Sequence, residues 1–213
     1  MKRQPLVLIW IVMVLSAIVV PSTFADGPIE GRSGRAEVRF MEGMSDHHQM
    51  AIDMALDCLT RTDVSDSLRE VCQAVVDAQQ PEIEQLQTWL LEWYNIEYDP
   101  MAMADLMGMI DEGMGGMDHD SMDMSGMPYT DPVMMMGMFA GFNRLEGVDY
   151  EIAWFEAMID HHDDAVHMSK RLLQRDPDGV GHAELRALAE DIVTAQTAEI
   201  NSYEELLLAF ENQ

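Results

Sequence analysis

The sequence predicts an all-α protein, a four-helix bundle built from two repeated helical hairpins with a long irregular methionine-rich insert between them. Three observations predict this architecture. From residue 36 onward, apolar residues recur with the helical period, and no segment alternates as a strand would. Two distant segments share the motif Met-x-Asp-His-His, at Met44–His48 and Met158–His162. Each hairpin has one apolar face, which it buries by packing against the other hairpin.

The N-terminus predicts export. Lys2 and Arg3 precede an apolar run over 6–20, and small residues follow as far as Ala25. This pattern is typical of a secretory signal peptide over 1–25, because the apolar core is shorter than the ~20 residues of a spanning helix. An uncleaved membrane anchor is the alternative. With a cleaved signal we expect a periplasmic or secreted protein without stable membrane insertion.

The first hairpin is expected over residues 36–98, after a flexible lead at 26–35. Its helices are predicted at 36–60 and 67–94. The second of these helices is expected to begin with the capping box Ser67–Glu70, in which serine and glutamate satisfy the first backbone N–H groups.

The only two cysteines, Cys58 and Cys72, lie on either side of the turn between these helices. In an exported chain such a pair favours one disulfide bond across the helix–turn–helix. A pair of soft metal ligands is the alternative.

The second hairpin is expected over 149–213, with helices at 149–175 and 182–211. Both hairpins together form one bundle domain, and the insert at 99–148 connects them. Because this connection is long, the topology need not be simple up-and-down.

Helical spacing gathers candidate ligands on one stripe of each hairpin's first helix. The stripe residues with metal-binding side chains are Met44, His47, Met54, Met158, His161 and Met168. His48 and His162 are expected at the edge of the stripe, nearer solvent. Gln79 and Gln196 interrupt the apolar stripes of the partner helices, where a buried amide can orient an imidazole as a second-shell residue.

A second reading of these residues stays open. A single buried histidine is more often a hydrogen-bonded core residue than a ligand, and buried methionines usually fill the core. The repetition of the Asp-His-His triplet favours ligation. His167 has no histidine counterpart and is expected on the surface.

The insert is rich in sulfur, since residues 101–138 contain 13 of the 21 methionines. Glycine, aspartate and serine interrupt them, so no continuous apolar face forms. A low-complexity linker and a sink for oxidants are alternatives to metal binding. We expect metal binding, with ligands in a cluster made of Met114, Met117, His119, Met122, Met124 and Met127.

Ligand softness indicates copper. Thioethers prefer copper(I) or silver(I), while imidazoles and carboxylates also accommodate copper(II). The usual zinc spacings, an EF-hand loop and a repeated Glu-x-x-His di-iron motif are all missing from the sequence. The net charge of −27 argues against nucleic-acid binding and attracts cations.

The repeated motif resembles the domain-of-unknown-function family 305. It reads F-x3-M-x2-HH-x2-A-x2-M from Phe40 to Met54, followed by Gln-x2-Glu-Ile from Gln79 to Ile83. The second copy begins at Trp154 in place of the phenylalanine. The resemblance implies a ferritin-like bundle and an exported copper-binding protein. Asp46 and Asp160 stand where members of this family often have proline.

Three hypotheses follow. The first is a non-enzymatic copper-binding protein for copper tolerance or trafficking, whose partners are metal ions and an exported protein that delivers or accepts copper. Similarity of Met117–Met122 to methionine/histidine motifs of exported copper-resistance proteins supports it. The second is a ferritin-like redox enzyme that oxidises copper or iron. The third is a helical module that binds a partner independently of metal.

Overall fold

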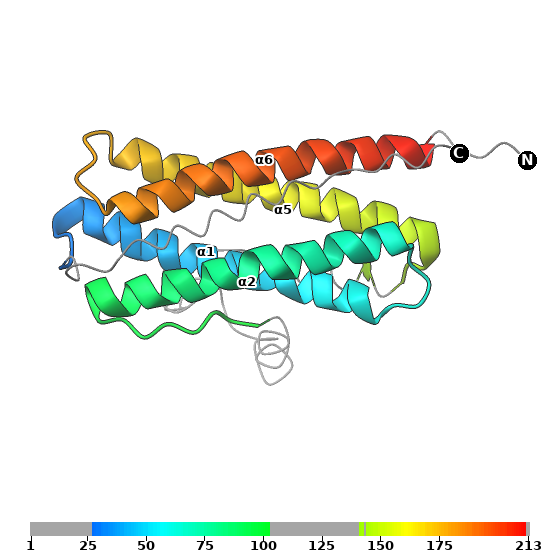
Figure 1. Ribbon diagram of the computed structural model, residues 1–213, viewed down its shortest axis with the longest axis horizontal. Coiled ribbons are helices and arrows are strands. Elements are labelled where there is room, and N and C mark those ends of the chain that lie inside the picture. The colour runs from blue at the N-terminus through cyan, green and yellow to red at the C-terminus, as the bar shows by residue number, and fades with distance from the viewer. Residues whose placement is uncertain (1–26, 103–140, 143, 212–213) are drawn as a thin grey trace, which may run out of the picture.

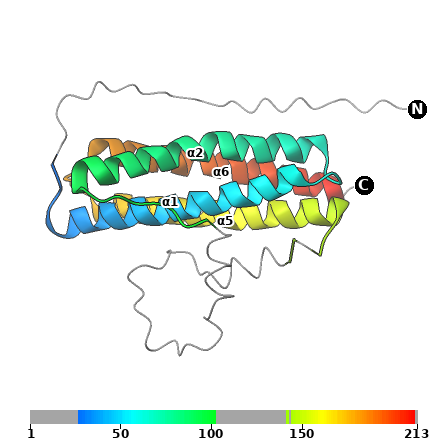
Figure 2. The ribbon, with the colours of Figure 1, turned by 90° about the horizontal axis from the view of Figure 1, so that it is seen from below.

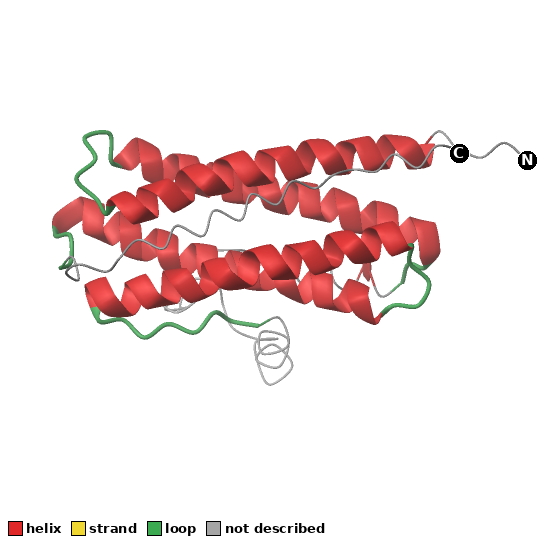
Figure 3. Ribbon diagram, viewed as in Figure 1, coloured by secondary structure: helices red, strands yellow, loops and turns green. Residues whose placement is uncertain are grey.

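The computed structural model describes residues 27–102, 141–142 and 144–211. Its long helices form a bundle (Figure 1), and the described residues contain no strand (Figure 3). The helices are α1 (Gly31–Thr60), α2 (Asp66–Tyr94), α5 (Gly147–Arg175) and α6 (Ala183–Glu211). The predicted all-α bundle is therefore confirmed. None of these four helices combines the length and hydropathy that a membrane crossing requires.

Some predictions concern other parts of the chain. The signal peptide over 1–25 and most of the insert lie outside the described residues. The same holds for the predicted insert ligands Met114, Met117, His119, Met122, Met124 and Met127.

Helix α1 begins at Gly31, before the predicted start at residue 36, so the second half of the expected flexible lead is helical. Two glycines allow this start. Gly31 has a positive φ of 79°, which suits a residue without a side chain. At Gly34 a Cβ atom would lie 1.7 Å from the carbonyl oxygen of Ile29, so only glycine lets the preceding chain pack so closely.

Helix α2 is capped by Ser65, and the predicted capping box at Ser67–Glu70 is wrong. The Ser65 hydroxyl accepts a hydrogen bond from the Leu68 N–H at 3.2 Å. The carboxylate that completes the cap comes from another helix: Glu151 of α5 accepts the Ser65 N–H at 2.7 Å and its hydroxyl at 2.8 Å. A local sequence pattern cannot reveal a partner so distant in the chain.

The two hairpins pack through α1 and α5, with α2 against α1 and α6 against α5. Helices α2 and α5 run in the same direction, so the connection between them crosses the length of the bundle (Figures 1 and 2). A single long crossover is the topology of ferritin-like bundles. The sequence left the topology open, and the structure shows that the helix order is not simple up-and-down.

Two apolar clusters occupy the two ends of the bundle. One contains Cys58, Tyr150 and Trp154, near the α1–α2 turn. The other contains Phe40 and Leu185, near the α5–α6 turn. Between these clusters lies the layer of polar side chains described below.

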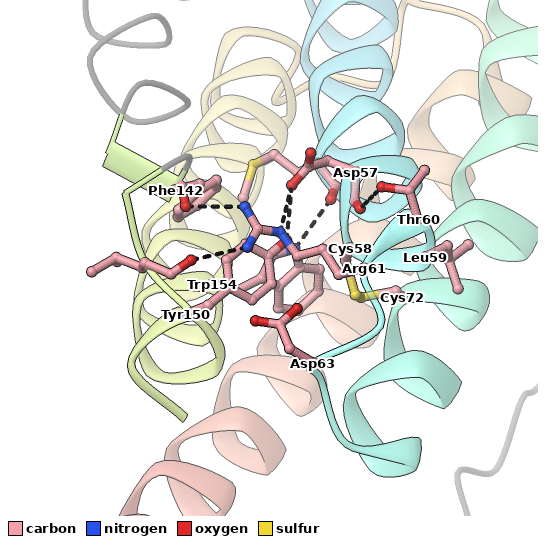
Figure 4. Close-up of polar contacts among 12 residues, drawn as sticks. Asp57, Cys58, Leu59, Thr60, Arg61, Asp63, Cys72, Phe142, Tyr150 and Trp154 are labelled. Carbon is pink, nitrogen blue, oxygen red and sulfur yellow. Dashed lines mark hydrogen bonds and ion pairs between the residues drawn. A yellow bond between two sulfur atoms is a disulfide. The ribbon is translucent and has the colours of Figure 1, made fainter. Parts of the chain in front are cut away.

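A disulfide and an arginine secure the first of these ends (Figure 4). Cys58 and Cys72 form a disulfide bond between α1 and α2. The Arg61 guanidinium donates to the carbonyl oxygens of Phe142 and Leu145, at 3.0 Å each, and lies 3.7 Å from the centre of the Tyr150 ring. Arg61 thereby attaches the chain that enters α5 to the end of α1.

Candidate metal centre

A layer of buried polar side chains crosses the middle of the bundle. Its histidines come from α1 and α5, and its amides from α2 and α6. The members are His47, His48, His161, His162, Gln79 and Gln196, and each is at most 4% exposed. The repeat explains the layer, because antiparallel packing of α1 on α5 brings the two Asp-His-His motifs to the same level.

His47 and His161 meet across the junction of the two hairpins. Their ring centroids are 3.6 Å apart with an angle of 35° between the planes. His161 Nε2 donates to the carbonyl oxygen of His47 at 2.9 Å, which leaves its Nδ1 as an acceptor without a partner. Neither ring nitrogen of His47 has a hydrogen-bond partner. The sequence prediction that both face the core is confirmed.

The electrostatic environment keeps this pair neutral. Burial lowers the pKa of His47 and of His161 well below the usual 6.5, and the positive charge that neighbouring histidines can carry lowers it further. A neutral imidazole is the form that binds a metal ion. The pair therefore offers free lone pairs at neutral pH without first releasing a proton.

His48 and His162 are fully buried, so the prediction that they lie nearer solvent is wrong. Each ring turns from the stripe toward the second helix of its own hairpin, which covers it. His48 Nε2 lies 2.6 Å from Glu82 Oε2. His162 Nε2 lies 2.8 Å from Glu199 Oε2, although this contact is not aligned as a hydrogen bond. The Nδ1 atoms of both rings have no partner.

Glu82 and Glu199 are candidate orienting residues that the sequence-based assignment of this role did not include. A carboxylate that accepts one imidazole N–H fixes the tautomer and raises the basicity of the other nitrogen, as in many metal sites. The signal was present, because Gln-x2-Glu occurs in both partner helices and places both residues on one face. The Oε1 atoms of Gln79 and Gln196 have no hydrogen-bond partner, so the orienting role of these amides stays a prediction.

The four predicted methionines lie on both sides of the histidine layer. Met54 and Met158 belong to the apolar cluster near the disulfide, and Met44 belongs to the opposite cluster. These three are fully buried, while Met168 is partly buried against the same cluster as Met44. Thioethers therefore flank the imidazoles from above and below.

The described residues contain no group of three or more His, Cys, Asp or Glu side chains arranged to hold a metal ion. The donors of the histidine layer and its two sides are imidazoles and thioethers, a set that suits a soft monovalent ion.

Two further histidines lie away from this layer. His167 is exposed, as predicted. His182 is buried at the far end of the bundle, where Glu37 accepts its Nδ1–H and its backbone N–H, both at 2.7 Å. Its ring stacks on Trp93 at 3.7 Å, and Tyr94 also donates to Glu37. This network joins α1 and α2 to the turn that precedes α6, and the sequence pattern gave no sign of it because its members are not repeated.

The family described as "Domain of unknown function (DUF305)" matches residues 37–207. No curated protein matches the chain. Among solved structures, the chain is similar to a DUF305 protein of Streptomyces coelicolor that is described as secreted, with 27% identity and a TM-score of 0.58. That match covers 82% of this chain and 93% of the other.

The chain is also similar to CopM, which has been solved with copper. The Cu(II)-bound form has 22% identity, a TM-score of 0.57 and coverage of 82% of this chain and 97% of CopM. The Cu(I)-bound form has 21% identity, the same TM-score and coverage of 82% and 96%. At this level of identity the likeness establishes a shared fold.

Proposed function

The chain belongs to the DUF305 family, and from this premise we propose that it is an exported copper-binding protein that acts in copper tolerance or trafficking without catalysis. It holds copper(I) through imidazoles and thioethers of the bundle, and further copper through the methionine-rich insert. Copper(II) is accommodated by the imidazoles. The secreted DUF305 protein and the metal-bound forms of CopM support export and copper binding.

One observation carries the proposal: four buried imidazoles lie in one layer of the bundle, with His47 and His161 in contact across the junction of the hairpins, and ring nitrogens of all four are unpaired among the described residues. An unsatisfied buried polar atom costs roughly 1–3 kcal/mol, so a cluster of them lowers the stability of the empty protein. A bound ion would satisfy these nitrogens and recover that free energy. Binding would therefore stabilise the fold.

The donor set favours copper(I) over harder ions. Met44 and Met158 precede His47 and His161 by one helical turn, and both thioethers are fully buried. Thioether sulfur together with imidazole is a donor set that prefers a soft monovalent ion.

The test is copper(I) competition against a colorimetric chelator, without oxygen and with ascorbate as reductant so that the disulfide stays intact. Three proteins are compared: the mature chain 26–213, a deletion of 101–138, and a bundle variant. The bundle variant carries Met44→Leu, His47→Gln, Met158→Leu and His161→Gln. We expect the deletion and the bundle variant each to lose part of the copper. Unchanged stoichiometry in the bundle variant contradicts the bundle site, and no competition by any protein contradicts copper binding.

The redox enzyme remains a second candidate because of one observation, the pairing of Glu82 with His48 and of Glu199 with His162. Carboxylates beside histidines are what an oxidase of this fold needs. Steady oxygen consumption with added copper(I) or iron(II) would favour the enzyme. A single stoichiometric uptake favours binding.

A further inference from the structure

The chain that leaves α2 turns back along the first hairpin. Asn95 ends the helix with a positive φ of 54°, and the Asn95 and Ile96 N–H groups donate to the carbonyl oxygens of Leu91 and Leu90. The chain then runs back along the bundle (Figures 1 and 2). Gln87 of α2 donates to the Tyr98 carbonyl oxygen at 3.0 Å, which holds the returning chain on the helix.

Asp46 of α1 fixes the end of this segment. Its Oδ2 accepts the Tyr98 hydroxyl at 2.6 Å, and its Oδ1 accepts the Met101 backbone N–H at 3.2 Å. Asp46 is 4% exposed, so both of its oxygens are used for these bonds away from solvent. Hydrogen bonds to a charged acceptor are stronger than neutral ones, which makes this a firm attachment.

The attachment lies at the level of the histidine layer. Asp46 directly precedes His47, and consecutive helical residues differ by only ~1.5 Å along the axis. Tyr98 packs against one apolar cluster and Met101 against the other, so the segment crosses the layer between them. Met101 is the first methionine of the methionine-rich insert.

Among the described residues, the second hairpin has no equivalent attachment at the residue that matches Asp46. Asp160 occupies the position of Asp46 in the repeat, but it is exposed. The same residue type therefore has two different environments, and the buried one is used to place Met101. The Asp-His-His motif does not by itself require a buried aspartate, because the histidines are buried in both copies but only Asp46 is buried.

We propose that Asp46 is a positioning residue that holds Met101 beside the histidine layer, where the Met101 thioether receives copper(I) and passes it to the imidazoles. The step is a ligand exchange: a sulfur–copper bond is replaced by a nitrogen–copper bond, and the oxidation state does not change. This inference rests on the proposed function, and it assigns copper entry to the α1–α2 side of the layer.

The experiment uses the full mature chain and two measurements. Amide hydrogen exchange of the metal-free protein reports whether the segment is held. The time course of copper(I) transfer from a colorimetric chelator complex reports how fast copper is loaded. We define the core phase as the kinetic phase of this time course that disappears in H47Q/H161Q. The variants are Asp46→Ala, its matched control Asp160→Ala, and Met101→Leu. If D46A does not fold, Y98F is used in its place, because it removes the hydrogen bond from the Tyr98 hydroxyl to Asp46.

In D46A we expect exchange of the Met101 amide to become faster by about tenfold, because its acceptor is lost. We expect the core phase to slow by about tenfold in both D46A and M101L, because an unheld or absent donor has a lower effective concentration at the site. D160A should match the wild type in both measurements. A further variant, Asp46→Asn, keeps one acceptor oxygen and should be intermediate.

Each of the following results overturns the proposal. Equal exchange in D46A and D160A shows that Asp46 does not hold the segment. Faster exchange with an unchanged core phase shows an anchor without a role in loading. The absence of any core phase in the wild type removes the proposed function as well, whereas a normal wild-type phase that neither variant alters removes this inference alone.

Discussion

The two hairpins agree in the histidine layer and differ in what surrounds it. Each contributes two adjacent buried histidines and a glutamate within 2.8 Å of the second one. The layer therefore has the same chemistry on both sides of the α1–α5 junction. Features that occur in both copies identify the candidate site.

Features that occur in one hairpin serve other purposes. Cys58 and Cys72 form a disulfide in the first hairpin, whereas Leu172 and Ala189 fill the matching positions of the second hairpin with apolar side chains. Asp46 on α1 and Arg61, the residue that directly follows α1, attach the chain on either side of the insert. The difference indicates that the first hairpin holds the chain before and after the insert, whereas both hairpins contribute histidines to the candidate site.

The largest expected effect tests whether the halves form one site. His47 and His161 are in direct ring contact, so we expect a single shared site. Either double variant, H47Q/H48Q or H161Q/H162Q, should weaken copper(I) binding by the bundle more than about 100-fold, because each removes half of the imidazoles. Each double variant is made in the protein that lacks 101–138, so that only the bundle binds copper. Chelator competition then measures both the affinity and the number of copper ions bound. Retention of half of the bundle copper in either variant would indicate two separate sites.

The disulfide should produce the next largest effect, on stability. Closing the short loop between Cys58 and Cys72 is expected to stabilise the protein by about 3 kcal/mol through the unfolded state. Urea unfolding of oxidised and reduced wild type measures the difference. A Cys58→Ala/Cys72→Ala variant should show no response to the reductant. Coincident midpoints for the oxidised and reduced wild type contradict the prediction.

A pH dependence should separate His47 and His161 from the other histidines. Their folded pKa lies well below 6.5, so as the pH falls below about 6.5 the unfolded chain takes up protons that the folded protein does not. The free energy of unfolding should then fall by up to about 1.4 kcal/mol per pH unit for each of the two, and not change from this cause at higher pH. Urea unfolding between pH 7.5 and 5.5 measures the slope. An H47Q/H161Q variant with the wild-type slope would refute this origin.

The sequence predicts the fold well because its signals are local. The helical period locates all four helices, and the repeat predicts that His47 and His161 face a shared core. Prediction from the sequence fails where a side chain contacts a residue that is distant in the chain. A helical wheel of one helix places His48 at an exposed edge, but the hairpin partner helix covers that edge with Glu82.

The network around His182 was missed for the same reason. Glu37 and Tyr94 come from two helices and His182 from the turn before a third, and no spacing in the sequence connects them. The buried Asp46 is a further case, since its exposed counterpart Asp160 has the same sequence context. Local patterns give the orientation of a helix, while long-range contacts decide which of its polar residues are buried.

The smallest expected effect tests whether the carboxylates act equally in the two hairpins. Glu82→Gln and Glu199→Gln keep the size and an acceptor oxygen but remove the charge that raises the basicity of the adjacent imidazole. Each should weaken copper(I) binding by the bundle about tenfold, the lower end of the range for partners of metal ligands. Glu84→Gln is the matched control, because Glu84 is exposed on the same helix and its carboxylate accepts a hydrogen bond only from Gln80 in the described contacts. An effect of E82Q equal to that of E84Q would remove the orienting role. An effect of E82Q without one of E199Q would show that the better aligned His48 pair dominates, and that the halves differ within the site as well as around it.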